Sequence, residues 1–170
     1  MRTKLLFLSL ITASICFAQS RREIILSEGW QFSRDKAQWE NVIVPHDWAI
    51  SGPFDKKWDI QTVAIVQNGE KTATEKTGRS GALPWIGEGY YKLTFQIPEG
   101  YKHAELIFDG AMAEPTVSIN GKKAGYWAYG YNAFRIDATP YLTSGNNQLE
   151  VSLNNLEESS RWYPGAGIYR

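Results

Sequence analysis

The chain has 170 residues, with 18 basic and 18 acidic side chains and no formal net charge at pH 7. This balance lacks the basic patch that nucleic acid or an anionic membrane surface attracts, so neither is expected as a partner. The seven tryptophans and nine tyrosines fit two interpretations, rings that fill a β core and rings that stack on the apolar faces of sugars.

Residues 1–18 are predicted to be a secretory signal peptide. Two basic residues precede the apolar run Leu5–Phe17, and Cys16-Phe17-Ala18 resembles a small-x-small cleavage site. The run is too short for a membrane span, so a secreted or periplasmic protein without membrane insertion is expected. Cleavage removes the only cysteine, which excludes disulfides and a thiol nucleophile from the mature chain. A lipoprotein acylated on Cys16 is the weaker alternative, because Ile15 stands where a small residue is expected.

Short alternating runs of apolar and polar residues predict nine strands after the signal peptide. Asn120-Gly121 predicts a tight type I′ hairpin turn, since both central residues of that turn need positive φ. No stretch keeps a helical period for three turns, and the pattern therefore predicts an all-β sandwich or barrel. The predicted strands are residues 24–26, 30–32, 42–44, 91–97, 104–108, 117–119, 124–126, 134–136 and 149–153.

One segment interrupts this rhythm. Asp55–Gly81 is polar and rich in Lys, Thr and Gly, with a single apolar patch at Val63–Val66. It predicts a long excursion that contains one strand. Loops of this length inside compact domains are usually functional or mobile.

Common catalytic motifs are absent from the sequence. There is no Gly-x-Ser-x-Gly, no phosphate-binding loop, no His-Glu-x-x-His and no Gly-x-Gly-x-x-Gly. His46 and His103 are the only histidines, and a pair so placed is more often structural than metal-binding. We therefore expect no metal site, no cofactor and no catalytic residue. Acidic residues are plentiful, but nothing in their local context singles out a catalytic pair.

Three clusters remain as candidates for binding. Val44–Trp48 places Asp47 just beyond a strand, where it either binds a ligand or bonds nearby amides in a turn. Tyr126–Asn132 carries four rings that form a sugar platform, cover the sandwich or face a neighbouring domain. Arg161-Trp162-Tyr163 begins a turn rich in Pro and Gly.

In these residues the chain resembles the N-terminal domain of glycoside hydrolase family 2, in particular its β-galactosidase-like members from Bacteroidetes. The similarity covers nearly all of residues 29–170 in the family's order. The matching stretches are 44–48, 52–54, 89–91, 108–110, 117–121, 130–131, 134–137, 140–142 and 160–170.

The resemblance implies a jelly-roll (galactose-binding-like) β-sandwich over residues 19–170, with carbohydrate as ligand. In the family this domain precedes an immunoglobulin-like domain and a barrel that carries both catalytic glutamates of a retaining mechanism. No position here corresponds to either glutamate, so the chain alone is expected to be inactive. The aromatic-rich ending at Arg170 favours a domain truncated at its C-terminal end, since natural termini tend to be frayed and polar.

The resemblance also implies that the Asp47 turn and the Arg161-Trp162 turn lie at the barrel mouth and contact the terminal sugar. There Asp47 would accept hydrogen bonds from sugar hydroxyls and Trp162 would stack on a sugar face. Arg161 would pair with a charged substituent, for which its guanidinium fork is suited. The rival interpretations are a stand-alone carbohydrate-binding module and a purely structural domain.

Overall fold

The computed structural model describes residues 21–51, 60–76, 87–155 and 165–170. Alternating side chains build its two longest strands, β5 (Gly87–Gln96) and β11 (Asn146–Asn155). Successive side chains of a strand point to opposite faces, so every second residue is buried from Gly89 in β5 and from Asn147 in β11. The two strands pair antiparallel over their full length and form the centre of the domain.

These strands lie in the middle of a six-stranded antiparallel sheet with the order β2-β1-β5-β11-β8-β9. One edge is formed by β1 (Trp30–Ser33) and β2 (Glu40–Val42), and the other by β8 (Thr116–Ile119) and β9 (Lys122–Tyr126). The inner face of the sheet supplies half of the buried core cluster: Trp30, Phe32, Tyr91, Leu93, Phe95, Val117, Ile119, Leu149, Val151 and Leu153.

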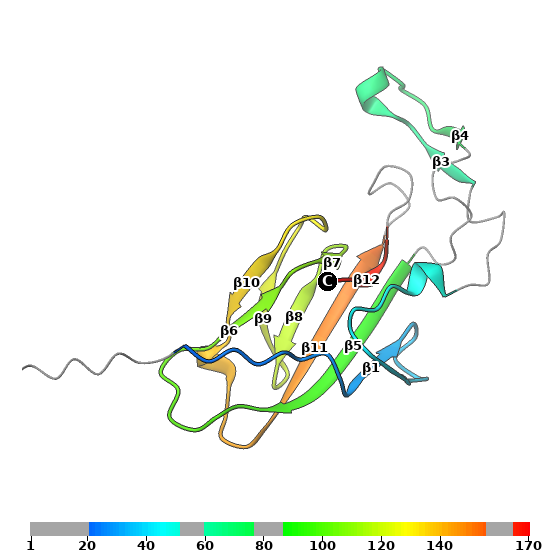
Figure 1. The fold of residues 1–170 in the computed structure, drawn as a ribbon. Helices are drawn as coiled ribbons and strands as arrows, with labels where there is room; N and C mark the ends of the chain where they lie inside the picture. Colours follow the sequence, from blue (N-terminus) through cyan, green and yellow to red (C-terminus); the bar gives the residue numbers. More distant parts are fainter. Residues whose placement is uncertain (1–20, 52–59, 77–86, 156–164) are drawn as a thin grey trace, which may run out of the picture.

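A second layer covers this inner face (Figure 1). It contains the antiparallel pair β6 (Glu105–Phe108) and β10 (Phe134–Asp137), and the pair β7 (Ala111–Met112) and β12 (Gly167–Ile168). The described residues contain no α-helix and only short 3₁₀ turns, namely η1 (Trp48–Ile50), η3 (Val66–Asn68) and η4 (Thr139–Tyr141). The predicted all-β sandwich is therefore confirmed.

The predicted hairpin at Asn120-Gly121 is also confirmed. Asn120 has φ 51° and Gly121 has φ 74°, as a type I′ turn requires. The turn joins β8 to β9, which pair antiparallel. Asn120 adds its own contacts, since its side-chain amide donates to the backbone oxygen of Tyr141 at 2.9 Å.

Three local predictions differ from the structure. Residues 24–26 do not form a strand. The only backbone hydrogen bond described near them joins the Val44 amide to the oxygen of Ser27, and one bond does not make a strand pair. The strand predicted at 42–44 ends at Val42. The described part of the 55–81 excursion holds two strands, β3 (Gln61–Val63) and β4 (Thr74–Lys76), in a hairpin that stands away from the sandwich in Figure 1.

Candidate functional site

The Asp47 turn begins the site. Asp47 is the N-cap of η1, and its Oδ1 accepts the backbone N–H of Ala49 at 2.8 Å. Aspartate suits this position, because its short carboxylate satisfies an amide that the helix itself leaves unpaired. The next residue, Trp48, is fully buried and stacks on Phe32, with ring centroids 5.2 Å apart. The aromatic anchor fixes the chain directly after Asp47.

A second segment, residues 165–170, runs beside this turn. The His46 N–H donates to the Ile168 oxygen at 2.8 Å, and the Trp48 N–H donates to the Ala166 oxygen at 2.9 Å. Asp47 Oδ1 accepts the Ala166 N–H at 3.0 Å, across 119 residues of sequence. The carboxylate therefore joins two segments that meet only in the folded protein.

The other carboxylate oxygen faces Gly165. A Cβ built on Gly165 would lie 2.9 Å from Asp47 Oδ2, so the glycine leaves space that a larger residue would fill. Among the described residues, the hydrogen bonds of Asp47 fall on Oδ1. A carboxylate offers about four lone-pair sites, and Oδ2 brings further acceptor capacity to this half-buried turn.

Arg161 and Trp162, the other predicted site residues, lie outside the described residues. The segment that follows them, Gly165–Ile168, is bound to the Asp47 turn by the three bonds given above. The structure therefore places Asp47 beside that segment and leaves the roles of Arg161 and Trp162 as predictions.

A partly buried polar pair lies next to the turn. His46 Nδ1 is 2.7 Å from the hydroxyl of Tyr91, which also donates to the His46 backbone oxygen at 3.3 Å. Burial lowers the pKa of His46, although the carboxylates of Glu40 and Asp47 act in the opposite direction. Burial also raises the pKa of Tyr91. Sequence reasoning missed this pair, although the alternation around Tyr91 marked that ring as a core residue.

We expect acid to weaken the domain through His46. Because its folded pKa lies below the ordinary 6.5, its contribution to stability is complete above pH 6.5 and is lost as the pH falls toward the folded pKa. The free energy of unfolding, measured by urea denaturation from about pH 8 to about pH 5, should decline below the ordinary histidine value. His46→Asn should flatten this decline, since asparagine does not titrate.

His103→Asn removes the other histidine of the chain and is the matched comparison. A decline that persists unchanged in His46→Asn would contradict the assignment to His46.

The aromatic cluster lies in the connection from β9 to β10. Its rings are partly exposed: Tyr126 48%, Trp127 36%, Tyr129 58% and Tyr131 48%. Trp127 stacks on Phe134, with centroids 5.8 Å apart and planes within 8°, and Phe134 stacks in turn on Phe108. Trp127 thus covers part of the sandwich, as one of the predicted alternatives has it, and the sugar platform and the face to a neighbouring domain stay predictions for the other rings.

Two further observations concern the described residues as a whole. No group of three or more His, Cys, Asp or Glu side chains there is arranged to hold a metal ion. His103 instead lies 3.7 Å from Glu105 and 3.7 Å from Asp137 on an exposed surface. Within the same residues no helix is long and apolar enough to cross a membrane.

The fold and the turn define a class, a jelly-roll β-sandwich that holds a carboxylate at the end of its sheet. Residues 13–170 match the family model described as "Glycosyl hydrolases family 2, sugar binding domain". The chain belongs to this family, and the predicted resemblance is confirmed.

Individual relatives agree. The chain is 38% identical over 136 residues to the β-galactosidase BoGH2A of Bacteroides ovatus, covering 78% of this chain and 14% of that protein. A solved family 2 glycosyl hydrolase from Bacteroides cellulosilyticus gives a TM-score of 0.67 at 27% identity, with 85% of this chain and 19% of that chain covered. A β-glycosidase from Bacteroides vulgatus gives 0.64 at 32%, with the same coverage of 85% and 19%.

Proposed function

We propose that this chain is the N-terminal sugar-binding domain of a secreted, retaining exo-glycosidase with a β-galactosidase-like preference. The observation that carries the proposal is the Asp47 carboxylate, which residues 165–168 hold in place within a family 2 sugar-binding domain. The chain spans only 14% of the β-galactosidase relative. In this proposal the catalytic glutamates, the barrel and the immunoglobulin-like domain therefore belong to polypeptide outside these residues.

The chemistry of the turn supports a role in sugar binding. Two backbone amides hold Oδ1, so the carboxylate is oriented before any ligand arrives. Oδ2 then accepts a hydrogen bond from a sugar hydroxyl, and bonds to a charged acceptor contribute more than bonds between neutral groups. Trp162 stacks on the sugar and Arg161 pairs with a charged substituent in the same proposal.

The test is to express the complete gene and assay nitrophenyl β-galactoside, with residues 1–170 alone assayed beside it. We expect the complete protein to release galactose with its β configuration retained, as proton NMR of the first product reports. The 1–170 chain should give no turnover above background.

The second candidate is a stand-alone carbohydrate-binding module, which the Asp47 geometry supports equally well. Sugar binding by the complete protein without hydrolysis would establish the module and contradict the glycosidase.

Export is part of the first proposal, and mass spectrometry of the exported protein should show Gln19 at its N-terminus. An acylated Cys16 would instead identify a lipoprotein.

A further inference from the structure

Four exposed rings, Tyr126 at the end of β9 and Trp127, Tyr129 and Tyr131 in the β9–β10 connection, are here called the aromatic platform. We propose that the aromatic platform binds a carbohydrate chain, as an extension of the sugar site at the Asp47 turn. The inference rests on the proposed function. The inference specifies the substrate class of the proposed glycosidase. The substrate is an oligosaccharide or polysaccharide and not a single sugar linked to a small aglycone.

The Trp127 ring of the platform is held in place before any ligand binds. The Trp127 amide donates to the Pro115 oxygen at 3.0 Å, and its indole Nε1–H donates to Asn132 Oδ1 at 2.8 Å. Its ring is the outermost of three nearly parallel rings, above Phe134 and Phe108. Ordering a flexible side chain on binding costs free energy. A ring that is already fixed avoids this cost.

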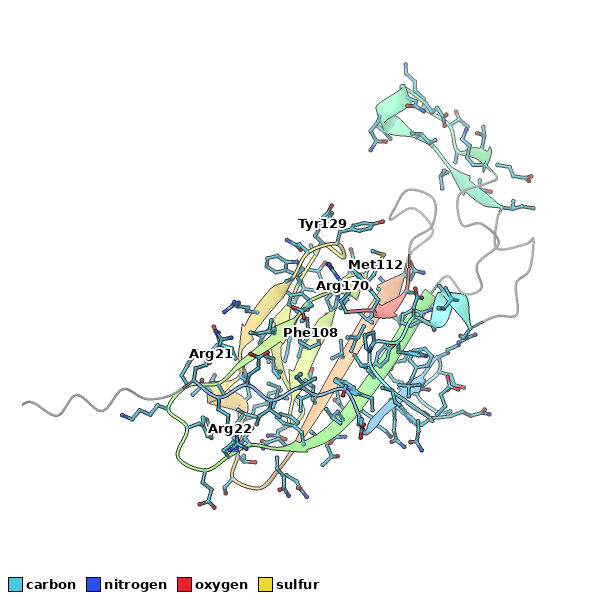
Figure 2. All side chains as sticks on the ribbon, viewed as in Figure 1. Arg21, Arg22, Phe108, Met112, Tyr129 and Arg170 are labelled. Carbon is cyan, nitrogen blue, oxygen red and sulfur yellow. The ribbon has the colours of Figure 1, made fainter. Side chains whose placement is uncertain are left out.

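The middle of the connection is tied down as well. The Tyr169 hydroxyl donates to the Gly130 oxygen at 2.6 Å, and the Arg170 guanidinium donates to the Tyr131 oxygen at 3.4 Å. Gly130 lies against Met112, since a Cβ built there would be 2.9 Å from Met112 Cγ. Figure 2 shows Tyr129 at the outer end of this connection, with Met112 and Arg170 lying nearer the body of the sandwich.

The composition of the platform suits a sugar. The three tyrosine rings carry a phenol hydroxyl, and Trp127 presents the edge of an indole whose N–H is already bonded to Asn132, which together suit a ligand with apolar ring faces and a rim of hydroxyls. The exposed large aliphatic side chains of the described residues lie elsewhere in the sequence: Ile24, Ile25, Ile43, Ile50, Ile60, Val66 and Ile107. An exposed aromatic cluster of this kind marks an interaction site.

Residues 165–170 connect the platform to the proposed sugar site. Ala166 bonds to Asp47 at one end of this segment, and Tyr169 and Arg170 bond to the platform's connection at the other. Four extended residues span roughly 13 Å. In this proposal that separation is within the length of a short oligosaccharide, whose terminal sugar lies at Asp47 and whose later residues lie over Tyr129 and Tyr131.

The test uses the complete protein and three soluble probes, namely a β-galactan, an arabinogalactan and a glucuronoxylan. Affinity electrophoresis in the cold measures the dissociation constant for each polysaccharide. The polysaccharide that wild type binds is then tested on the Tyr129→Ala/Tyr131→Ala variant. This variant should bind it at least about tenfold more weakly, the scale expected when two stacking rings are lost. Tyr129→Phe/Tyr131→Phe keeps the rings and should stay within about threefold of wild type, since an exposed hydroxyl contributes little.

Nitrophenyl β-galactoside separates this inference from the proposed function. Its kcat/KM should be unchanged in both double variants, because a small aglycone does not reach the platform. Ile25→Ala, which alters an exposed residue outside the platform, is the control for surface substitution. The platform would be overturned by unchanged polysaccharide binding in the double alanine variant. It would also be overturned if wild type bound none of the three polysaccharides. In either case, continued hydrolysis of nitrophenyl β-galactoside would leave the proposed function standing.

A double alanine variant that loses thermal stability and activity toward both kinds of substrate would also overturn the platform. That result would show the rings packing against another part of the protein.

Discussion

Gly167→Ala is expected to lower the free energy of unfolding by at least about 3 kcal/mol. Gly167 has φ 130°, which disfavours any residue with a Cβ. A Cβ there would lie 2.2 Å from the His46 backbone oxygen and 2.7 Å from the Tyr91 hydroxyl. The backbone oxygen has little freedom to move, because the His46 N–H is bonded to Ile168. Urea denaturation followed by tryptophan fluorescence measures the loss.

Gly121→Ala is the matched control. Gly121 also has positive φ, at 74°, but no heavy atom lies within 4 Å of a Cβ built there. It should cost only about 1 kcal/mol, the strain of the backbone conformation alone. The difference between the two variants measures the close approach of the 165–170 segment to the Asp47 turn. Equal losses would show that this approach does not hold the segment in place.

Under the proposed function, Asp47→Asn is expected to lower kcat/KM of the complete protein by about tenfold or more, the size of one lost charged hydrogen bond. Asparagine keeps an oxygen that can accept the Ala49 and Ala166 amides and replaces the anionic Oδ2 with an amide group. The free energy of unfolding should therefore change by less than about 1 kcal/mol. Nitrophenyl glycoside kinetics and urea denaturation give the two numbers.

Asp47→Ala should lower both quantities, because it leaves two backbone amides without their acceptor at about 1–3 kcal/mol for each buried group. Asp35→Asn is the matched control, since Asp35 Oδ1 likewise accepts two backbone amides, from Ala37 and Gln38, in the turn between β1 and β2. It should leave kcat/KM unchanged. Normal kinetics in Asp47→Asn would assign Asp47 a structural role alone.

Much of the sandwich follows from local pattern. The alternation at 91–97 and 149–153 placed the central strands, because a strand buried on one face must repeat every two residues. Asn120-Gly121 was sufficient for its hairpin, since few residue pairs accept positive φ in succession. The strand prediction for residues 24–26 was wrong, because alternating residues form a strand only where a neighbouring strand is available to pair with them.

The site divides in the same way. The sequence indicated Asp47 as a turn residue, and capping of η1 is a local property that an Asp at the first position of a turn favours. The aromatic run 126–131 was visible as well. The sequence did not show which of these rings face solvent. Their exposure depends on Phe134 and Phe108, which lie on different strands of the second layer.

By itself the sequence determined the fold class, the family resemblance and the residues that carry polar chemistry at strand ends. All of these depend on short-range pattern or on motifs in a fixed order. Only the tertiary structure decided that residues 165–170 bind both the Asp47 turn and the aromatic platform. The physical reason is that contacts across 119 residues depend on how two layers pack and on the empty space at Gly167, and no local periodicity encodes that register.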